Sequence, residues 1–302
     1  MIEATALTKR FGGTTAVEDL TFTVRPGRVT GFLGPNGAGK STTLRLILGL
    51  NDPTSGAVTV GGRPFRDRPR GLRHVGALLD AGDVHGGRTA VAHLAVLARA
   101  NRVPRRRVDA VLADVGLTGA ARRRVGGFSL GMRQRLGIAA ALLGDPPVLL
   151  FDEPLNGLDP EGVLWVRGLF RRLADEGRTV FVSSHLMSEM EHTADDLVVI
   201  GRGRLIAAEP VSAFAARGTG SGVRVRTPRP ADLARLLTAE GARVERDGPR
   251  LTVTGLDAAR IGDLACRHSL PLHELAAREA SLEDAFMELT ADSAEFLTGE
   301  AR

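Results

Sequence analysis

Cysteine is almost absent from this chain of 302 residues, because Cys266 is the only one, so no disulfide can form within the chain. A single thiol is typical of a protein that works in a reducing compartment. The sequence also lacks an apolar run of about twenty residues, which a membrane-spanning helix needs, and its best candidate, residues 138–151, is interrupted at Gly144. The first residues lack the basic and apolar blocks of a signal peptide. We therefore expect neither a transmembrane segment nor a secretion signal.

Aromatic side chains are also scarce, since tyrosine is missing and Phe, Trp and Tyr together make up 4% of the chain. The net charge is nevertheless +5, and basic residues form short clusters at residues 66–70, 105–107 and 122–124. A nucleic-acid surface usually interleaves basic residues with aromatic ones that stack on bases. The clusters are therefore better explained as solvated faces, and no nucleic-acid partner is expected.

Lysine occurs only at Lys9 and Lys40, while arginine fills every other basic position. Lys40 belongs to residues 34–41, Gly-Pro-Asn-Gly-Ala-Gly-Lys-Ser, which follow the apolar run 29–33 and precede a helical pattern. Strand, glycine loop and helix in this order are the context of a P-loop. A glycine-rich turn that matches by chance is the alternative. It is disfavoured because the lysine is kept where a slim ammonium must fit between phosphates.

A P-loop binds a nucleoside triphosphate through backbone N–H groups that surround the phosphate oxygens at a helix N-terminus. Lys40 would reach the β- and γ-phosphates, and the Ser41 hydroxyl would hold Mg²⁺. The candidate ATP-binding residues in this segment are Gly34, Asn36, Gly37, Gly39, Lys40, Ser41 and Thr42.

Two adjacent carboxylates, Asp152 and Glu153, follow the apolar strand predicted at residues 148–151. Burying adjacent acids is costly unless a cation or a reacting group uses them. Asp152 is placed to hold Mg²⁺ through its water shell, and Glu153 to orient or deprotonate an attacking water. The alternative is a pair of acids that cap the next turn. His185 ends the predicted strand 179–184, where it can touch a γ-phosphate.

Two further candidates carry weaker signals. Phe11 lies upstream of the P-loop strand and can stack on adenine, although an aromatic that closes a hairpin against the core explains it equally well. Ser129 precedes a predicted helix with Gly131 in its first turn, and a helix start with a serine N-cap is an anion site.

Five motifs, in this order and spacing, resemble those of the nucleotide-binding subunit of an ABC transporter: the P-loop, residues 128–132, 150–154 and 157–159, and His185. The resemblance covers about residues 2–215. It implies an α/β P-loop NTPase of ABC type, with a β-rich N-terminal part and a helical subdomain at about residues 89–143. It also implies a head-to-tail pair of subunits that enclose two ATP molecules.

In such a pair, Ser129 and Gly131 of one copy would complete the P-loop site of the other, and Asp159 would lie in the dimer turn. The chain departs from the family's common Leu-Ser-Gly-Gly-Gln at Leu130 and Met132. The family also usually places a glutamine in the hinge loop, where it touches Mg²⁺ and senses the membrane partner. The only glutamine here is Gln134, so by position this role falls to Asp80, and a carboxylate ligates magnesium well.

The C-terminal part differs in composition. Residues 218–222 have the sequence of a flexible linker, and the pattern over residues 223–302 predicts a small ferredoxin-like α+β domain. Residues 280–289 resemble the end of ATP-binding subunits from export systems of the daunorubicin-resistance type, in which the tail serves assembly or regulation. The predicted domains are therefore an ABC ATPase domain at residues 1–217, the linker, and this C-terminal domain.

The function implied is an ATPase subunit, with ATP and Mg²⁺ as cofactors, that powers export of a drug-like or amphipathic compound. It would work as a homodimer at the cytoplasmic face of the membrane with separate permease subunits, although a heterodimer of cassettes remains open. The alternative is a soluble ABC ATPase acting on ribosomes or nucleic acid. That class usually has two cassettes or a long coiled-coil insertion, whereas this sequence has one P-loop and no sustained heptads.

The first prediction concerns Glu153 and His185. We expect Glu153→Gln to bind ATP and to trap the dimer, because the amide keeps the shape of the side chain but cannot take a proton from water. His185→Ala should be similarly slow. Steady-state phosphate release and size-exclusion chromatography with ATP test both variants, and normal turnover by Glu153→Gln would remove this residue from its role.

Overall fold

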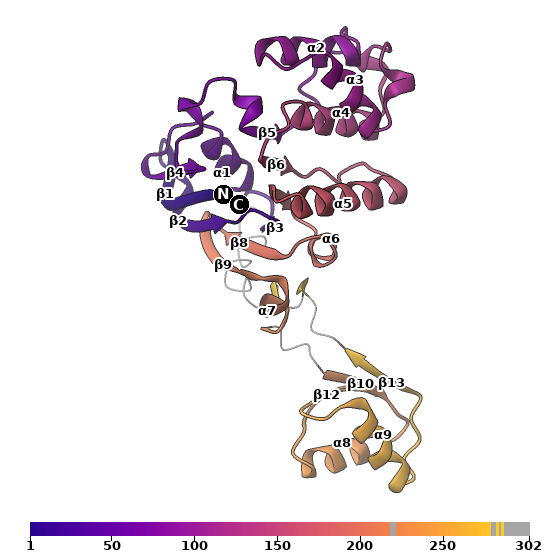
Figure 1. Ribbon diagram of the computed structural model, residues 1–302. Helices are drawn as coiled ribbons and strands as arrows, with labels where there is room; N and C mark the ends of the chain where they lie inside the picture. The colour runs from indigo at the N-terminus through magenta and orange to yellow at the C-terminus, as the bar shows by residue number, and fades with distance from the viewer. Residues whose placement is uncertain (218–221, 279–281, 284, 287–302) are drawn as a thin grey trace, which may run out of the picture. The chain divides into compact units, whose positions relative to one another are not determined.

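The computed structural model describes residues 1–217, 222–278, 282, 283, 285 and 286 (Figure 1). The chain forms two compact units, Met1–Pro210 and Val211–Arg302. The expected boundary after residue 217 lies a few residues further along the chain. The expected linker at residues 218–222 falls outside the described residues except for Gly222, at which a strand begins.

The first unit contains a three-stranded antiparallel sheet in the order β2-β1-β4. Its strands are β1 (Ile2–Phe11), β2 (Thr14–Val24) and β4 (Ser55–Val60). β1 and β2 form a hairpin around Gly12, whose φ of +56° favours glycine. In β2 the side chains of Leu20, Phe22 and Val24 are buried and the threonines between them are exposed. The β-rich N-terminal part that the resemblance implies is present.

The same unit contains a six-stranded sheet in the order β5-β6-β7-β3-β8-β9. The strands are β3 (Arg28–Leu33), β5 (Val75–Leu78), β6 (Val148–Asp152), β7 (Thr179–Ser184), β8 (Asp196–Gly201) and β9 (Arg204–Pro210). All neighbours are parallel except β8 and β9. Leu33 pairs with Ser184, and Asp152 pairs with Ser183. The carboxyl ends of β3, β6 and β7 therefore meet at one edge of the sheet.

Both faces of this sheet are covered, as expected for near-continuous apolar strands in a parallel sheet. On one face, Phe22, Phe32 and Phe181 form a ring cluster with centroid distances of 5.0 to 6.0 Å, and α1 (Lys40–Ile47) contributes three buried side chains to the same core. On the other face, Phe170 of α5 (Pro160–Asp175) packs on Phe151 at 4.8 Å. The short helix α6 (Met187–Glu191) follows β7.

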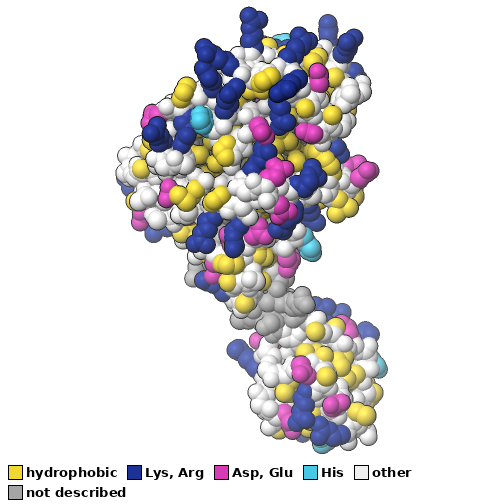
Figure 2. Space-filling view, in the orientation of Figure 1, with side chains coloured by type: hydrophobic (Ala, Val, Ile, Leu, Met, Phe, Trp, Pro, Cys, Tyr) yellow, Lys and Arg dark blue, Asp and Glu magenta, His cyan; other side chains and the backbone are white. Residues whose placement is uncertain are grey.

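A helical part, expected at about residues 89–143, contains α2 (Ala90–Ala100), α3 (Arg106–Asp114) and α4 (Leu130–Leu142), which lie together in Figure 1. A Cβ at Gly76 of β5 would lie 1.9 Å from the carbonyl oxygen of Ala141, so the glycine permits α4 to approach the sheet closely. Figure 2 shows many basic side chains over this part, and all of them are arginine because residues 89–143 contain no lysine. Single 3-10 turns occur at Phe65–Asp67, Gly71–Arg73, Thr118–Ala120 and Val125–Gly127.

The second unit begins with α7 (Val211–Ala215) and then has the element order β10, α8, β11, β12, α9, β13. The bounds are β10 (Gly222–Arg226), α8 (Pro230–Ala239), β11 (Arg243–Asp247), β12 (Arg250–Thr254), α9 (Ala258–Arg267) and β13 (Glu274–Arg278). The four strands form an antiparallel sheet in the order β11-β12-β10-β13. Residues 280–289, which resemble the end of export ATP-binding subunits, lie for the most part outside the described residues.

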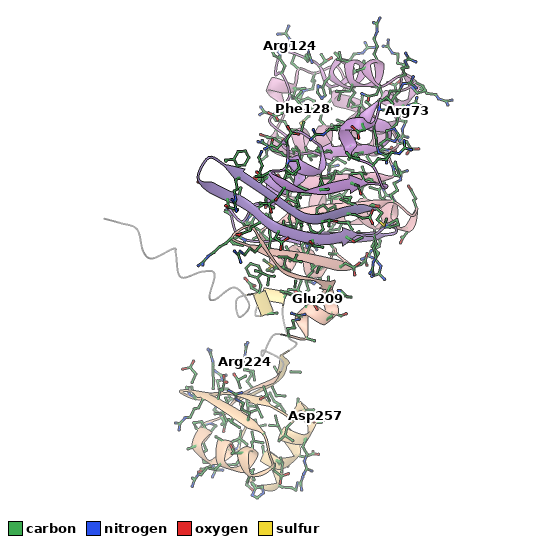
Figure 3. All side chains as sticks on the ribbon, turned by 90° about the vertical axis from the view of Figure 1, so that its left-hand side faces the viewer. Arg73, Arg124, Phe128, Glu209, Arg224 and Asp257 are labelled. Carbon is green, nitrogen blue, oxygen red and sulfur yellow. The ribbon has the colours of Figure 1, made fainter. Side chains whose placement is uncertain are left out.

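Buried side chains of α8 and α9 share one apolar core with the sheet of the second unit. Asp257, labelled in Figure 3, caps α9 by accepting a hydrogen bond from the Arg260 N–H at 2.7 Å. Over the described parts of both units, no helix is both long and apolar enough to span a bilayer.

The position of Phe181 in the ring cluster predicts that this side chain contributes strongly to stability. We expect Phe181→Ala to lower the free energy of unfolding by about 3–5 kcal/mol, because it leaves a cavity inside the ring cluster. The control is Leu50→Ala. Leu50 is 63% exposed, so this substitution should change the free energy of unfolding by no more than about 0.5 kcal/mol. Urea unfolding followed by circular dichroism tests both, and equal losses would contradict the assignment of the core.

Candidate nucleotide site

The loop at residues 34–39 connects β3 to α1 in the way expected of a P-loop. Its backbone has positive φ at Gly37 (+80°) and Gly39 (+103°). Added Cβ atoms at Gly34 and Gly39 would each lie 2.5 Å from a carbonyl oxygen, of Ile200 and Ala16 respectively. No side chain caps the N-terminus of α1, so its first N–H groups are open to an anion. The loop therefore fits a phosphate group.

A cavity of about 260 Å³ lies in front of this loop. This is smaller than the roughly 300–1,000 Å³ usual for a whole small-molecule ligand, and it suits the phosphate end of a nucleotide. The predicted ATP-binding residues of the loop line it, except for Gly34. The lining residues are Ala16, Pro35, Asn36, Gly37, Gly39, Lys40, Ser41, Thr42 and Glu153.

The Lys40 side chain is buried at the floor of the loop. Its Nζ donates hydrogen bonds to the carbonyl oxygens of Gly34 at 2.6 Å and Pro35 at 3.3 Å, and lies 3.7 Å from Glu153 Oε1. Burial lowers the pKa of Lys40, and the nearby carboxylates of Glu153 and Asp152 oppose this effect. The ammonium is thus costly to hold in its charged form, and an anion in the cavity would stabilise it.

Glu153 is held from several sides at the carboxyl edge of the sheet. Its Oε2 lies 2.9 Å from Nδ1 of His185, and its backbone has a φ of +48°. The Glu153 N–H donates to Ser183 Oγ at 3.0 Å, and the Ser183 hydroxyl donates in turn to Asp152 Oδ1. The structure therefore brings Lys40, Asp152, Glu153 and His185 together. A positive φ at a residue other than glycine is a strained conformation that is common at functional sites.

Ser183 is a site residue that the sequence reasoning missed. It lies one strand away from Asp152 and directly opposite it in the sheet. The signal that could have found it is its place two residues before His185, combined with the parallel pairing of β6 and β7. This one hydroxyl donates to the Asp152 carboxylate and accepts from the backbone N–H of Glu153.

Phe11 and Asp80 do not line the cavity. The Phe11 ring is half-exposed, and Lys9 Nζ lies 4.9 Å from its centroid while also donating to the carbonyl oxygen of Asp52 at 2.7 Å. Asp80 is exposed, and its carboxylate accepts a hydrogen bond from the Gly82 N–H at 2.6 Å, within its own loop. The roles predicted for both residues toward adenine and magnesium stay predictions.

The residues expected to act across a dimer lie at two helix starts. Ser129 caps α4 by accepting from the Met132 N–H at 3.2 Å, and Asp159 caps α5 by accepting from the Gly162 N–H at 2.9 Å. Phe128, labelled in Figure 3 beside the helical part, is buried. A Cβ at Gly131 would lie 3.5 Å from Leu158. The first turn of α4 therefore packs beside the segment between β6 and α5.

No three His, Cys, Asp or Glu side chains converge to bind a metal ion by themselves in the part of the chain that is described. A P-loop magnesium site does not need such a cluster, because a hydroxyl, phosphate oxygens and water supply most of its ligands. The Ser41 hydroxyl and the half-buried carboxylate of Asp152 fit this requirement.

The comparisons with known proteins agree with this geometry. A family model described as ABC transporter matches residues 17–156. The uncharacterized ABC transporter ATP-binding protein YhcH of Bacillus subtilis is 34% identical over 298 residues, which are 98% of this chain and 97% of that protein. The chain belongs to the ATP-binding subunits of ABC transporters. It is thus an ABC ATPase, and the predicted family and activity are confirmed.

Other relatives of this ABC ATPase have named functions. The bacitracin transport ATP-binding protein BcrA of Bacillus licheniformis is 42% identical over 209 residues, 68% of each chain. The Nod factor export ATP-binding protein I of Cupriavidus pinatubonensis is 35% identical over 298 residues, 96% of this chain and 90% of that protein. Residues 221–283 match a family described as Domain of unknown function (DUF8746).

Solved structures confirm the fold of the ATPase part. One described as an ATP binding subunit of an ABC transporter has a TM-score of 0.66 and 27% identity, and the match covers 72% of this chain and 92% of that one. The cassette MJ0796, in a dimeric post-hydrolysis state bound to ADP and Pi, has a TM-score of 0.64 and 24% identity over 70% of this chain and 98% of that one.

The geometry predicts a role for the Ser183 hydroxyl. We expect Ser183→Ala to lower kcat about tenfold or more with little change in KM, since the loss frees both Asp152 and the Glu153 backbone. Steady-state ATPase kinetics measure this. Thr30→Val is the control, because it removes a buried hydroxyl without a hydrogen-bond partner from the neighbouring strand β3. An equal fall in kcat in both variants would contradict the prediction.

Proposed function

We propose that this ABC ATPase powers export of an amphipathic or antibiotic-like compound through separate membrane permease subunits. The proposal that ATP hydrolysis powers transport rests on one observation, the convergence of Lys40, Glu153 and His185 at one edge of the sheet. An antibiotic-like compound is supported by a relative named for bacitracin transport. The direction is supported by a relative named for Nod factor export, which aligns over 96% of this chain. The transported compound would be bound by the permease.

The proposed roles within the site follow from the contacts. The P-loop N–H groups and Lys40 would hold the phosphates of ATP, and Phe11 would stack on adenine. Glu153, oriented by His185, would accept a proton from the attacking water. Ser41, Asp152 and Asp80 would hold Mg²⁺, which neutralises phosphate charge when bound.

The active form would be a homodimer in which each copy completes the other's site. Ser129 caps α4, Gly131 lies in the first turn of this helix, and Leu130 between them is 54% exposed. The N–H groups of this turn would face the γ-phosphate bound by the other copy, and Asp159 would lie at the turn between the copies. The dimeric MJ0796 cassette, which shares the fold, is consistent with such an arrangement.

The second unit would be a ferredoxin-like domain that serves assembly or regulation. Its element order, strand–helix–strand–strand–helix–strand, and its antiparallel strand order support this assignment. In this proposal the ATPase domain spans residues 1–217, the linker 218–222 and the C-terminal domain 223–302. The protein would be attached to the cytoplasmic face of the membrane only through its permease.

The test is a pull-down from detergent-solubilised membranes of the native host with tagged Glu153→Gln protein and MgATP, followed by mass spectrometry. We expect a polytopic membrane protein at near-equal amounts, because the variant should hold the ATP-bound dimer. Lys40→Ala is the matched control and should recover less of it, since it cannot retain the phosphates. Recovery of ribosomal proteins or nucleic acid without a membrane subunit would overturn the proposal and favour the soluble alternative.

A further inference from the structure

Gln134, the only glutamine of the chain, has an unusual environment on α4. Its side chain is buried, with 6% exposure, beneath the segment that follows β6. The Nε2 group donates hydrogen bonds to two backbone carbonyl oxygens, of Glu153 at 3.4 Å and of Asn156 at 3.3 Å. The amide nitrogen therefore contacts the backbone of Glu153, the residue proposed as the general base, and the turn that follows Glu153.

The acceptor end of the same amide is not used. Gln134 Oε1 is buried without a hydrogen-bond partner, and leaving a buried polar atom unpaired is costly. The opposite orientation of the amide would set its oxygen against two carbonyl oxygens. A side chain that served packing alone would favour an apolar residue of the same length, so the donor end explains why an amide is kept here.

The two carbonyls close a strained turn. The Asn156 N–H also donates to the Glu153 carbonyl at 3.3 Å, and Glu153 itself has a φ of +48°. A non-glycine residue in the left-handed region persists only when its surroundings determine it. Ser183 holds the N–H side of Glu153 at 3.0 Å, and Gln134 holds the carbonyl side. The carboxylate then lies between His185 and Lys40 because its backbone is fixed at both ends.

We propose that Gln134 is a positioning residue for ATP hydrolysis, which fixes the left-handed backbone of Glu153 through its amide donors. The inference rests on the proposed role of Glu153 as the base. Gln134 also connects Glu153 to the residues proposed to act across the dimer, because Ser129 caps the helix on which Gly131 and Gln134 lie. A displacement of α4 would reach the Glu153 carbonyl directly.

The test uses three variants of the full chain. Gln134→Met keeps the length and removes both donors, and Gln134→Glu replaces them with an acceptor. Ile138→Met is the matched control, because Ile138 is fully buried one turn further along α4. Steady-state ATPase kinetics should show kcat lowered about ten- to a hundredfold in Gln134→Met and further in Gln134→Glu. KM should stay within about twofold, and Ile138→Met should keep the wild-type kcat.

A double mutant separates positioning from other roles. In a Glu153→Gln background, Gln134→Met should cause no further loss of kcat and should leave ATP-dependent dimer trapping intact, because both changes act through one group. A lower Tm with wild-type kcat would overturn the inference in favour of packing, and a raised KM with unchanged kcat would overturn it in favour of binding. Normal turnover by Glu153→Gln alone would instead refute the proposed role of Glu153.

Discussion

The nucleotide site depends on the contacts of one buried charge, the ammonium group of Lys40. Its charge is taken out of water, which lowers its pKa, and its nearest charged partner, Glu153, lies 3.7 Å away. A buried ion pair of this kind is weak evidence for stability, because desolvation can exceed the Coulomb attraction. The P-loop carbonyls of Gly34 and Pro35 supply further partners. A phosphate ligand, as proposed for this site, would replace these contacts with stronger ones.

The sheet topology explains why a lysine after β3 meets a glutamate after β6. β7 lies between these strands, and its end supplies Ser183 and His185 to the same edge. Register is fixed by the cores on both faces, because a slip of one residue would turn Phe151 away from α5 and Phe181 away from the ring cluster. The strand pairing that aligns the core side chains thus also aligns Asp152, Ser183 and His185 at one edge of the sheet.

The sequence predicted which candidate residues come together where each of them lies at the end of one element. The P-loop, Asp152, Glu153 and His185 each follow a buried strand, and such patterns are local. It failed for Ser183 and Gln134, because the importance of each depends on a partner 30 and 19 residues away. The contact of the Asp80 carboxylate with the Gly82 N–H was likewise not predicted, since a short side chain in a glycine-rich loop readily binds its own backbone. No helical or strand period encodes such contacts.

The departure of this chain at Leu130 has a structural counterpart in the segment after β6. A Cβ at Gly157 would lie 2.1 Å from the Leu130 side chain. The leucine at position 130 therefore packs against a glycine at position 157, where a larger residue would clash with it. Leu130 over Gly157 and Gln134 on Asn156 and Glu153 attach α4 to this segment at two successive turns. The leucine at position 130 thus adds an apolar contact to the hydrogen bonds of Gln134 within one chain. If the first turn of α4 binds a ligand as proposed, the same contacts connect that turn to the backbone of Glu153.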